Sequence, residues 1–457
     1  MELKVTTGAW YGDSNISIKL PENSDVQYFW PKQIEGLTRK RINKIFDDYF
    51  DSLDFKNKLK GKKNVCIVID DITRPTPIQY PLEIIIDKLA LTIPYGAICI
   101  LIATGAHKPM SKEEIVKKVG KRLSEIVKVI NHDFTGRDLR YLGELKNGPI
   151  QLNQHFLDAD LRITVGGILP HNETGFGGGA KLIVPGIAGA DSISFFHGSL
   201  VPRTLGQIEG NIKVDRRGWA EEVTKKVGVD LSFFILINSH REIADIFIGD
   251  IVSTHRQAAS KCEEIVKTTI SRKEFDTADL CVINCYPLDT DPVQMGKALL
   301  SIKKYFKKKI LVINSASDGI FYHGMGMGSG VNLRRLIVNS VKIFRLKEMN
   351  RYLKTIRTLL FKPHLFLRYS YFFFNVLAYS KHKEKRRIDD RDLIPDEKSK
   401  LIIFSKNFPS SGLIQKYPNA RLIRELNSLE LFLSNHIQHK KILVFPCAPL
   451  QILNVSD

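Results

Sequence analysis

Short apolar runs alternate with polar turns through the first half of the chain. The runs at 64–69 (NVCIVI), 97–103 (AICILIA) and 161–165 (LRITV) have the length and composition of buried strands. Helical stretches such as residues 112–130 lie between them. Because strands and helices alternate, the pattern predicts an α/β fold with a mostly parallel sheet.

The same pattern starts again around residues 270–280. Further strands are predicted at 279–284, 309–314 and 441–446. A length of 457 residues is enough for two or three domains of about 150 residues each. We therefore predict two α/β domains with mostly parallel sheets, at residues 1–272 and 273–457.

Composition narrows the class of protein. Hydrophobic residues make up 43% and charged residues 26% of the chain, which is typical of a folded globular protein and not of a disordered or fibrous one. No apolar run reaches the roughly 18 residues that a membrane span needs, and the start of the chain lacks the pattern of a secretory signal. We expect a cytoplasmic protein. Six cysteines without zinc-site spacing argue against a disulfide framework or a structural zinc.

The net charge of +19 is concentrated in one basic aromatic segment, residues 334–387. Its 15 Lys and Arg residues stand against two Glu residues, so it carries +13 of the total. Such a segment could pack on the second domain with its charged face in solvent, lie on anionic lipid, or bind nucleic acid. We favour the first interpretation, place membrane-surface contact second and rank nucleic acid last.

Polar, loop-like sequences follow the three predicted strands of the first half. They read DDITRPTP, TGAHKP and GGILPHNETGFGGGAK. Because loops at the carboxyl ends of parallel strands line one ligand crevice, we expect these three loops to converge. They would bring Asp71, Arg74, His107, His171 and Lys181 to one site.

These residue types suit acid/base chemistry on a carboxylate. His107 and His171 each follow a strand in a Gly or Pro turn, and two imidazoles can move protons on either face of a substrate. Arg74 offers a planar fork for a carboxylate, although a surface arginine in a turn is the plain alternative. We interpret His132 and His323 as structural. For Lys181 and Lys297, the alternative to a functional role is that each is an ordinary solvent-exposed lysine.

The glycine-rich stretch 175–181 resembles a phosphate-binding loop only in part. That loop needs Gly at position 180 and Ser or Thr at position 182, where this chain has Ala180 and Leu182. The stretch also differs from the dinucleotide fingerprint, which belongs at a first strand-to-helix turn with an acidic residue downstream. Anion binding remains open, and triphosphate chemistry is disfavoured.

Six patterned words follow one another along roughly residues 8–330. They are DDITRPTP (70–77), TGAHKP (104–109), NHD (131–133), ADLRITVGGILPHNETGFGGGAKLIVPGIAG (159–189), His197 and PLDTDPVQMGKAL (287–299). With these words the chain resembles the nickel-pincer-dependent lactate racemase family. The word PH-x3-GF-x-GG-x-K-x3-PG is long and specific, whereas the C-terminal hundred-odd residues carry little of the resemblance.

The resemblance implies an active-site cleft between the two domains. It also implies a nickel-pincer nucleotide, that is Ni(II) pyridinium-3-thioamide-5-thiocarboxylic acid mononucleotide, attached covalently to Lys181, with His197 completing the nickel coordination. The remaining residues match as follows: His107 and His171 the acid/base pair, Arg74 the carboxylate-binding arginine, Gln294 and Lys297 further substrate-binding residues, and Asp71, Thr73, Gly177, Gly178 and Gly179 cofactor contacts.

The reaction implied is inversion of C2 of a 2-hydroxy acid by hydride transfer. The hydrogen on C2 is far too weakly acidic for an imidazole to remove it as a proton, so loss of hydride to the cofactor is the easier route. The expected partners are the 2-hydroxy acid and the enzymes that make the cofactor and insert nickel. Two positions depart from the family pattern: Gly177 replaces a common serine, and Phe196 a frequent polar residue.

Two other functions are open to test. A catalytically idle relative could bind a ligand or partner through the basic aromatic segment. An NAD-linked 2-hydroxy acid dehydrogenase would use similar Arg and His roles, but the absent dinucleotide fingerprint disfavours it.

Overall fold

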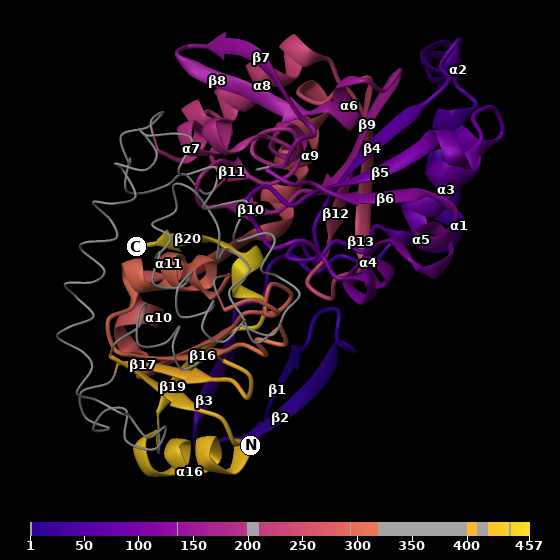
Figure 1. The fold of residues 1–457 in the computed structure, drawn as a ribbon. Coiled ribbons are helices and arrows are strands. Elements are labelled where there is room, and N and C mark those ends of the chain that lie inside the picture. Colours follow the sequence, from indigo (N-terminus) through magenta and orange to yellow (C-terminus); the bar gives the residue numbers. More distant parts are fainter. Residues whose placement is uncertain are drawn as a thin grey trace, which may run out of the picture.

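The computed structural model places two α/β domains side by side (Figure 1). The structure describes residues 2–134, 136–198, 210–292, 294–318, 400–408, 419–437 and 440–457. The basic aromatic segment and His323 lie outside the described residues. Within the described part, none of the helices combines the length and apolar character that crossing a bilayer demands.

The first domain is built on a six-stranded sheet with the order β13-β12-β9-β4-β5-β6. Every pair in it is parallel except β12 with β13, which closes one edge antiparallel. The strands are β4 (Val65–Asp70), β5 (Ile98–Ala103), β6 (Lys128–Asn131), β9 (Leu161–Gly167), β12 (Leu231–Ile237) and β13 (Ile243–Gly249). The three strands predicted for this half of the chain are therefore β4, β5 and β9, at the centre of the sheet.

Helices cover both faces of this sheet because its central strands are apolar on both sides. In β4, Ile67 and Ile69 belong to one core cluster, while Cys66 and Val68 belong to the other. One face carries α1 (Arg39–Phe50), α2 (Leu53–Leu59), α3 (Gln79–Ala90), α4 (Lys112–Val119) and α5 (Lys121–Ile126); the other carries α6 (Gln154–Leu157), α7 (Ala190–Gly198), α8 (Asp215–Val227), α9 (Ser253–Val266) and the hairpin β7 (Leu139–Leu145)–β8 (Gly148–Asn153).

The helix expected over residues 112–130 is shorter than predicted and is interrupted. Gly120 has φ of +86°, a left-handed conformation that ends α4 before α5 begins. Residues after Val127 then form β6, which pairs with β5. The β-branched Val129 and Ile130 fit this strand, so the helical prediction for 128–130 was wrong.

The second domain has an all-parallel sheet with the order β18-β17-β16-β15-β19-β3. Its strands are β3 (Asp25–Tyr28), β15 (Leu280–Asn284), β16 (Lys309–Ile313), β17 (Leu401–Phe404), β18 (Ala420–Ile423) and β19 (Lys441–Phe445). On one face lie α10 (Arg272–Thr277) and α11 (Met295–Tyr305); on the other lie α16 (Leu426–His436) and the hairpin β1 (Glu2–Thr7)–β2 (Ser14–Lys19). The strands predicted at 279–284, 309–314 and 441–446 all belong to this sheet.

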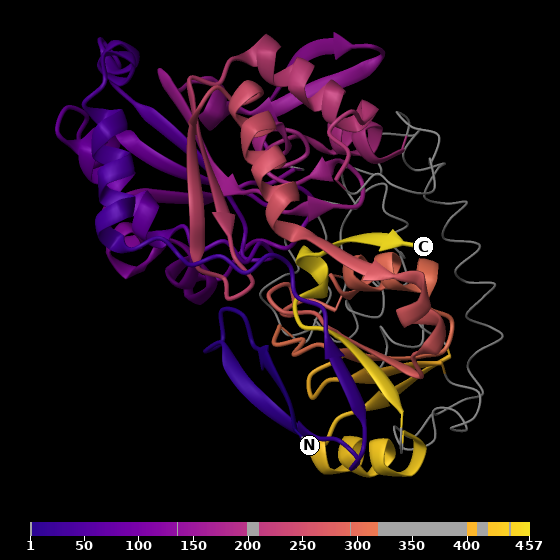
Figure 2. The same ribbon diagram turned by 180° about the vertical axis from the view of Figure 1, so that it is seen from behind.

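The first 28 residues lie with the second domain, although the predicted division at residue 272 assigns them to the first. Strand β3 extends the second sheet beside β19 (Figure 2). Leu3, Val5 and Ile18 of the hairpin pack into the second core. Near the junction, β14 (Lys267–Ser271) pairs with β20 (Ile452–Ser456) at the end of the chain. Both ends of the chain thus reach the second domain, a long-range pairing that no local pattern reveals.

Candidate active site

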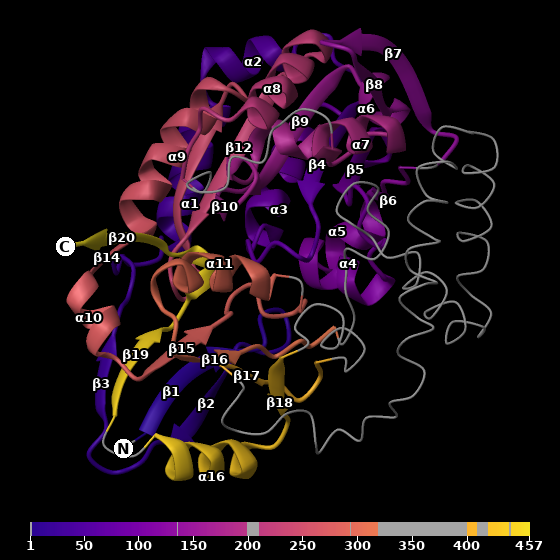
Figure 3. The same cartoon turned by 90° about the vertical axis from the view of Figure 1, so that its left-hand side faces the viewer.

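The three predicted loops follow adjacent strands at the carboxyl edge of the first sheet. Asp71, Thr73 and Arg74 follow β4, and His107 follows β5. His171 follows β9 in the short strand β10 (Pro170–His171), which pairs with β11 (Gly175–Phe176). Figure 3 shows α11 of the second domain facing this edge near β10.

His107 is held by a buried carboxylate. Its Nδ1 lies 2.6 Å from Oδ2 of Asp71, whose side chain is 2% exposed. The other oxygen of Asp71 accepts hydrogen bonds from the backbone N and the Oγ1 of Thr73, at 3.0 and 2.5 Å. Burial alone would raise the pKa of Asp71, but the charge and hydrogen bond of His107 outweigh it and hold that pKa well below its usual range. An ionised Asp71 places the proton of a neutral His107 on Nδ1, so the lone pair lies on Nε2.

Arg74 belongs to a loop whose backbone is bound by a lysine of α4. Its Nη1 donates to Oγ1 of Thr73 at 3.0 Å. Its backbone carbonyl accepts from Nζ of Lys118 in α4 at 3.1 Å, and the carbonyl of Thr76 accepts from the same amine at 3.2 Å. Lys118 is fully buried and pairs with Asp70 at 2.6 Å. A buried ion pair thus anchors the loop that presents the guanidinium.

Lys181 and His171 are direct neighbours. Nζ of Lys181 lies 2.6 Å from Nε2 of His171. Burial, followed by the positive charges of Arg74 and Lys297, lowers the pKa of Lys181 well below its ordinary value. Burial, followed by the charges of Lys181 and Lys297, does the same to the pKa of His171. Lys297 lies on α11, so a cation of the second domain acts on both side chains.

The glycine-rich loop passes between β11 and a short 3-10 helix at Gly179–Leu182. Gly179 has φ of +61°, and a Cβ there would lie 2.7 Å from Cδ2 of the buried His255. By contrast, a Cβ at Gly177 would meet only ordinary contacts, the nearest being the carbonyl O of Leu169 at 3.6 Å. The backbone geometry therefore demands glycine at 179, whereas position 177 has room for the serine common in the resembling family.

The side chains of two buried residues, Arg217 and His255, donate hydrogen bonds to carbonyl groups of this loop. Nε of Arg217 donates to the carbonyl of Thr174 at 2.9 Å, and its Nη2 donates to that of Phe176. Nε2 of His255 donates to the carbonyl of Gly177 at 2.9 Å. With its carbonyl groups bound on this side, the loop is fixed in one conformation.

His197, near the end of α7, is hydrogen-bonded through one ring nitrogen to the backbone of its own helix. Its Nδ1 donates to the carbonyl of Ile193 at 2.9 Å, which leaves the lone pair of the neutral ring on Nε2. Nε2 lies 3.8 Å from Oε2 of Glu173, whose Oε1 pairs with Arg216 at 3.2 Å. Burial, as the largest effect, lowers the pKa of His197 and favours the neutral, metal-binding form.

Phe196, where the family often has a polar residue, points into the core. It is fully buried and packs near Trp219 of α8, with ring centroids 6.4 Å apart. The side chain that departs from the family pattern is thus a packing residue of α7.

Gln294 lies at the start of α11, one turn before Lys297. Its side chain is 2% exposed, and Oε1 has no hydrogen-bond partner among the described residues. A buried amide oxygen without a partner costs free energy unless a ligand or water satisfies it. This position is therefore suited to contact a bound molecule.

Several residues around the site escape prediction from the sequence. Glu173 lies inside a predicted loop without being singled out, and Arg216, Arg217, His255 and Lys118 lie on helices with no chemical motif. The only local signal is the arginine pair that precedes Trp219 in α8, of which Arg217 is buried. His132 is structural as expected, because its Nε2 bonds the carbonyl of Ala188 at 2.9 Å and its Nδ1 contacts Asn153.

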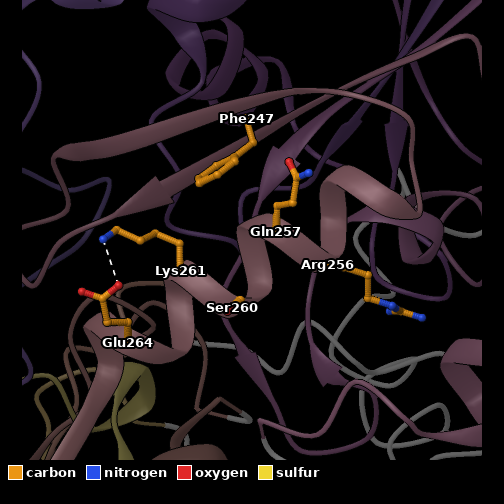
Figure 4. A pocket seen from close by; sticks show the side chains of 6 residues that line it. All are labelled: Phe247, Arg256, Gln257, Ser260, Lys261 and Glu264. Carbon is orange, nitrogen blue, oxygen red and sulfur yellow. Dashed lines mark hydrogen bonds and ion pairs between the residues drawn. The ribbon is translucent and has the colours of Figure 1, made fainter.

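A groove elsewhere on the first domain contains none of these residues. It runs along α9 and β13 and is lined by Phe247, Arg256, Gln257, Ser260, Lys261 and Glu264 (Figure 4). Lys261 and Glu264, one turn apart on α9, pair at 2.9 Å. The convergence of the predicted residues therefore assigns the candidate active site to the carboxyl edge of the first sheet.

Comparison with known proteins shows similarity to lactate racemases. Residues 11–205 match the lactate racemase N-terminal domain. The lactate racemase of Thermoanaerobacterium thermosaccharolyticum is 26% identical over 335 residues, 69% of this chain and 75% of that protein. The lactate racemase of Lactiplantibacillus plantarum is 28% identical over 337 residues, 70% and 76% respectively.

Solved structures share the fold. The lactate racemase apoprotein from T. thermosaccharolyticum has a TM-score of 0.64 at 19% identity, covering 99% of this chain and 100% of that one. A protein from Thermotoga maritima has a TM-score of 0.62 at 17% identity, covering 93% and 100%.

Proposed function

We propose that this chain, which is similar to lactate racemases, is an isomerase that inverts C2 of a 2-hydroxy acid. The observation that carries the proposal is the convergence of two histidines, a lysine and an arginine at one edge of the first sheet. His107, His171, Lys181 and Arg74 come from three separate loops. Lys181 contacts His171, and the charge of Arg74 acts on both of them and on Asp71, the partner of His107.

The residues present fit a lysine-tethered nickel-pincer nucleotide. Lys181 combines a lowered pKa with partial burial, so its amine is uncharged more readily than an exposed lysine and is a better nucleophile. Arg74 and Lys297 surround it with positive charge, which suits an anionic mononucleotide. In the neutral ring of His197 the lone pair lies on Nε2, which is the atom that would bind nickel.

Other residues of the loop edge complete the cofactor site in this proposal. Gly177, Gly178 and Gly179 let backbone approach the nucleotide closely, and Asp71 and Thr73 border it from the loop after β4. When bound, the group supplies a centre that accepts hydride from C2 and returns it.

The chain's own residues then bind the substrate and move the hydroxyl proton. Arg74, with Lys297 and Gln294 from the second domain, binds and orients the carboxylate of the 2-hydroxy acid. Nε2 of His107 takes the hydroxyl proton from one enantiomer, and Asp71 stabilises the imidazolium that results. His171 performs the same proton transfer for the opposite enantiomer. With the group bound, inversion would follow because the 2-keto acid is planar and could accept hydride on either face.

The proposal is tested on protein co-expressed with the cofactor-making and nickel-insertion enzymes. We expect about one nickel per chain, a mass adduct on Lys181, and loss of optical rotation with at least one member of a panel of 2-hydroxy acids. The Lys181→Ala variant, prepared in the same way, is the control for the adduct. Absence of both nickel and adduct from the wild-type protein would refute the cofactor assignment.

A further inference from the structure

The tip of the β1–β2 hairpin, residues 8–13, crosses from one domain to the other. The strands of the hairpin pack into the core of the second domain through Leu3, Val5 and Ile18. Trp10 at the tip packs instead against the core of the first domain. Figures 1 and 2 show the hairpin rising from the second sheet toward the first domain. One short element therefore has a hydrophobic anchor in each domain.

On the first-domain side, Trp10 lies against the two cations that hold the Arg74 loop. Its ring has the guanidinium carbon of Arg241 4.0 Å from its centre and Nζ of Lys118 at 5.1 Å. Nε of Arg241 donates to the carbonyl of Pro75 at 2.7 Å, and Lys118 donates to that of Arg74 at 3.1 Å. Cations over an indole are attracted to its face, so the ring restrains both donors.

On the second-domain side, the hairpin tip is bound to the loop that leads to Gln294. The backbone N–H groups of Gly8 and Ala9 donate to the two carboxylate oxygens of Asp289, at 2.7 and 3.2 Å. Asp289 is fully buried and lies between β15 and α11, five residues before Gln294. Asp289 therefore connects the hairpin tip to the start of α11, the helix that carries Lys297.

Asp13 completes the connection between the domains. Its carboxylate pairs with Nη1 of Arg241 at 2.6 Å and accepts from the hydroxyl of Tyr286 at 2.9 Å. Arg241 is 9% exposed and belongs to the first domain, whereas Tyr286 belongs to the second. A single carboxylate thus joins residues of both domains on the same side as Trp10.

From these contacts we propose that the hairpin tip positions Arg74 relative to Gln294 and Lys297, with Trp10 and Asp13 as its positioning residues. The inference rests on the proposed function, because it assigns those three residues to one substrate. Neither Trp10 nor Asp13 needs to touch the substrate. Loss of either removes no acid/base group but makes the distance between the two substrate-binding loops more variable, so substrate binding weakens more than turnover.

The test compares Trp10→Ala, Trp10→Phe and Asp13→Asn with the wild-type protein. Tyr141→Ala is the matched control, since Tyr141 lies on another hairpin, is 58% exposed and is far from these contacts in sequence. Hydrogen–deuterium exchange is measured on the full chain without cofactor, over peptides covering residues 70–77 and 287–294. Kinetics are measured on the cofactor-loaded proteins.

We expect faster exchange over both peptides in Trp10→Ala and Asp13→Asn, with wild-type rates in the control. For the loaded proteins we expect KM to rise by about tenfold while kcat stays within about threefold, and Trp10→Phe to recover most of the wild-type KM because it keeps an aromatic face.

Wild-type exchange over residues 70–77 in both Trp10→Ala and Asp13→Asn overturns the inference, whatever the kinetics. An unchanged KM with faster exchange also overturns it, because the loops would then move without affecting substrate. If the loaded wild-type protein racemises no 2-hydroxy acid, the proposed function fails, and the exchange experiment still decides whether the hairpin tip controls the two loops.

Discussion

Nζ of Lys181 lies 2.6 Å from Nε2 of His171, so the residue proposed to carry the cofactor contacts one of the two proposed acid/base groups. Burial and neighbouring positive charge lower the pKa of both. At neutral pH the amine of Lys181 and the imidazole of His171 are therefore disfavoured from both being protonated and positively charged. Burial and the charges of Arg74 and Lys297 favour the uncharged amine of Lys181, while the charge of Lys181 lowers the pKa of His171.

This relationship predicts the response of His171 to loss of the amine. In the unloaded Lys181→Met variant, the pKa of His171 should rise, because Lys181 is the largest charge acting against its protonation. It should stay below the ordinary 6.5, because burial, the larger cause, remains. NMR titration of histidine Cε1–H signals measures the change. His132, whose pKa burial lowers to about 4, is the internal reference. A fall in the pKa of His171 would contradict the prediction.

Asp71 predicts a specific dependence of stability on pH. Its folded-state pKa lies below the unfolded value of about 3.9, so its ionised form stabilises the fold above that pH. The contribution is lost as pH falls through the folded value. The difference in unfolding free energy between wild type and Asp71→Asn should therefore be largest near neutral pH and shrink below about pH 4. Denaturant titrations of both proteins at several pH values measure it; a difference that grows on acidification would rule out this account.

Arg74→Lys should weaken substrate use although the charge is kept. A lysine cannot donate the two parallel hydrogen bonds of a guanidinium, and we expect kcat/KM to fall by about 10- to 100-fold, mostly through KM. Arg122→Lys is the matched control, since Arg122 pairs with Asp87 through two N–H groups on a half-exposed surface. Racemisation rates over a range of substrate concentrations separate the two parameters. Equal losses in both variants would argue against a role for Arg74 in carboxylate binding.

The glycine-rich loop predicts opposite results at two positions. Gly177→Ser should leave stability within about 0.5 kcal/mol of wild type, because its Cβ meets no contact closer than 3.6 Å. Gly179→Ala should cost more than about 1 kcal/mol, because it combines positive φ with a Cβ 2.7 Å from the His255 ring. Chemical denaturation of the unloaded proteins measures both. Equal stability of the two variants would mean that the loop adapts.

The central strands and the loops after them are predictable because each depends on a local signal. A run such as NVCIVI is apolar on both faces, and the carboxyl ends of adjacent parallel strands meet at one edge, which brings Arg74, His107 and His171 together. The resemblance to a known family then supplied the roles of Lys181 and His197, which their local sequence alone leaves open.

What sequence could not provide depends on partners distant in the chain. In the sequence, Lys118 is one lysine of the charged stretch KEEIVKKV. In the structure it is fully buried, because its amine pairs with Asp70 and donates to two backbone carbonyls. Strand β3 reads DVQY, with little apolar character, and is a strand because β19 offers it an edge. Gly120 did carry a local signal, since glycine often ends a helix, and it marks the break that the prediction of one helix over 112–130 missed.

The Lys118–Asp70 pair predicts strong non-additivity. Lys118→Met leaves the buried Asp70 carboxylate unpaired and removes the donor to the Arg74 carbonyl, so we expect a loss of about 3–5 kcal/mol in unfolding free energy. The double variant Asp70→Asn/Lys118→Met removes the stranded charge and should recover part of that loss.

The surface pair of Arg122 and Asp87, each 47% exposed, provides the comparison, and Arg122→Met should cost less than about 1 kcal/mol. Urea denaturation of the four unloaded variants, Asp70→Asn included, completes the cycle. If Lys118→Met and the double variant lose equal stability, then removing Lys118 does not leave an unpaired charge on Asp70. The Arg74 loop would then owe its position to Arg241 and its own prolines rather than to this ion pair.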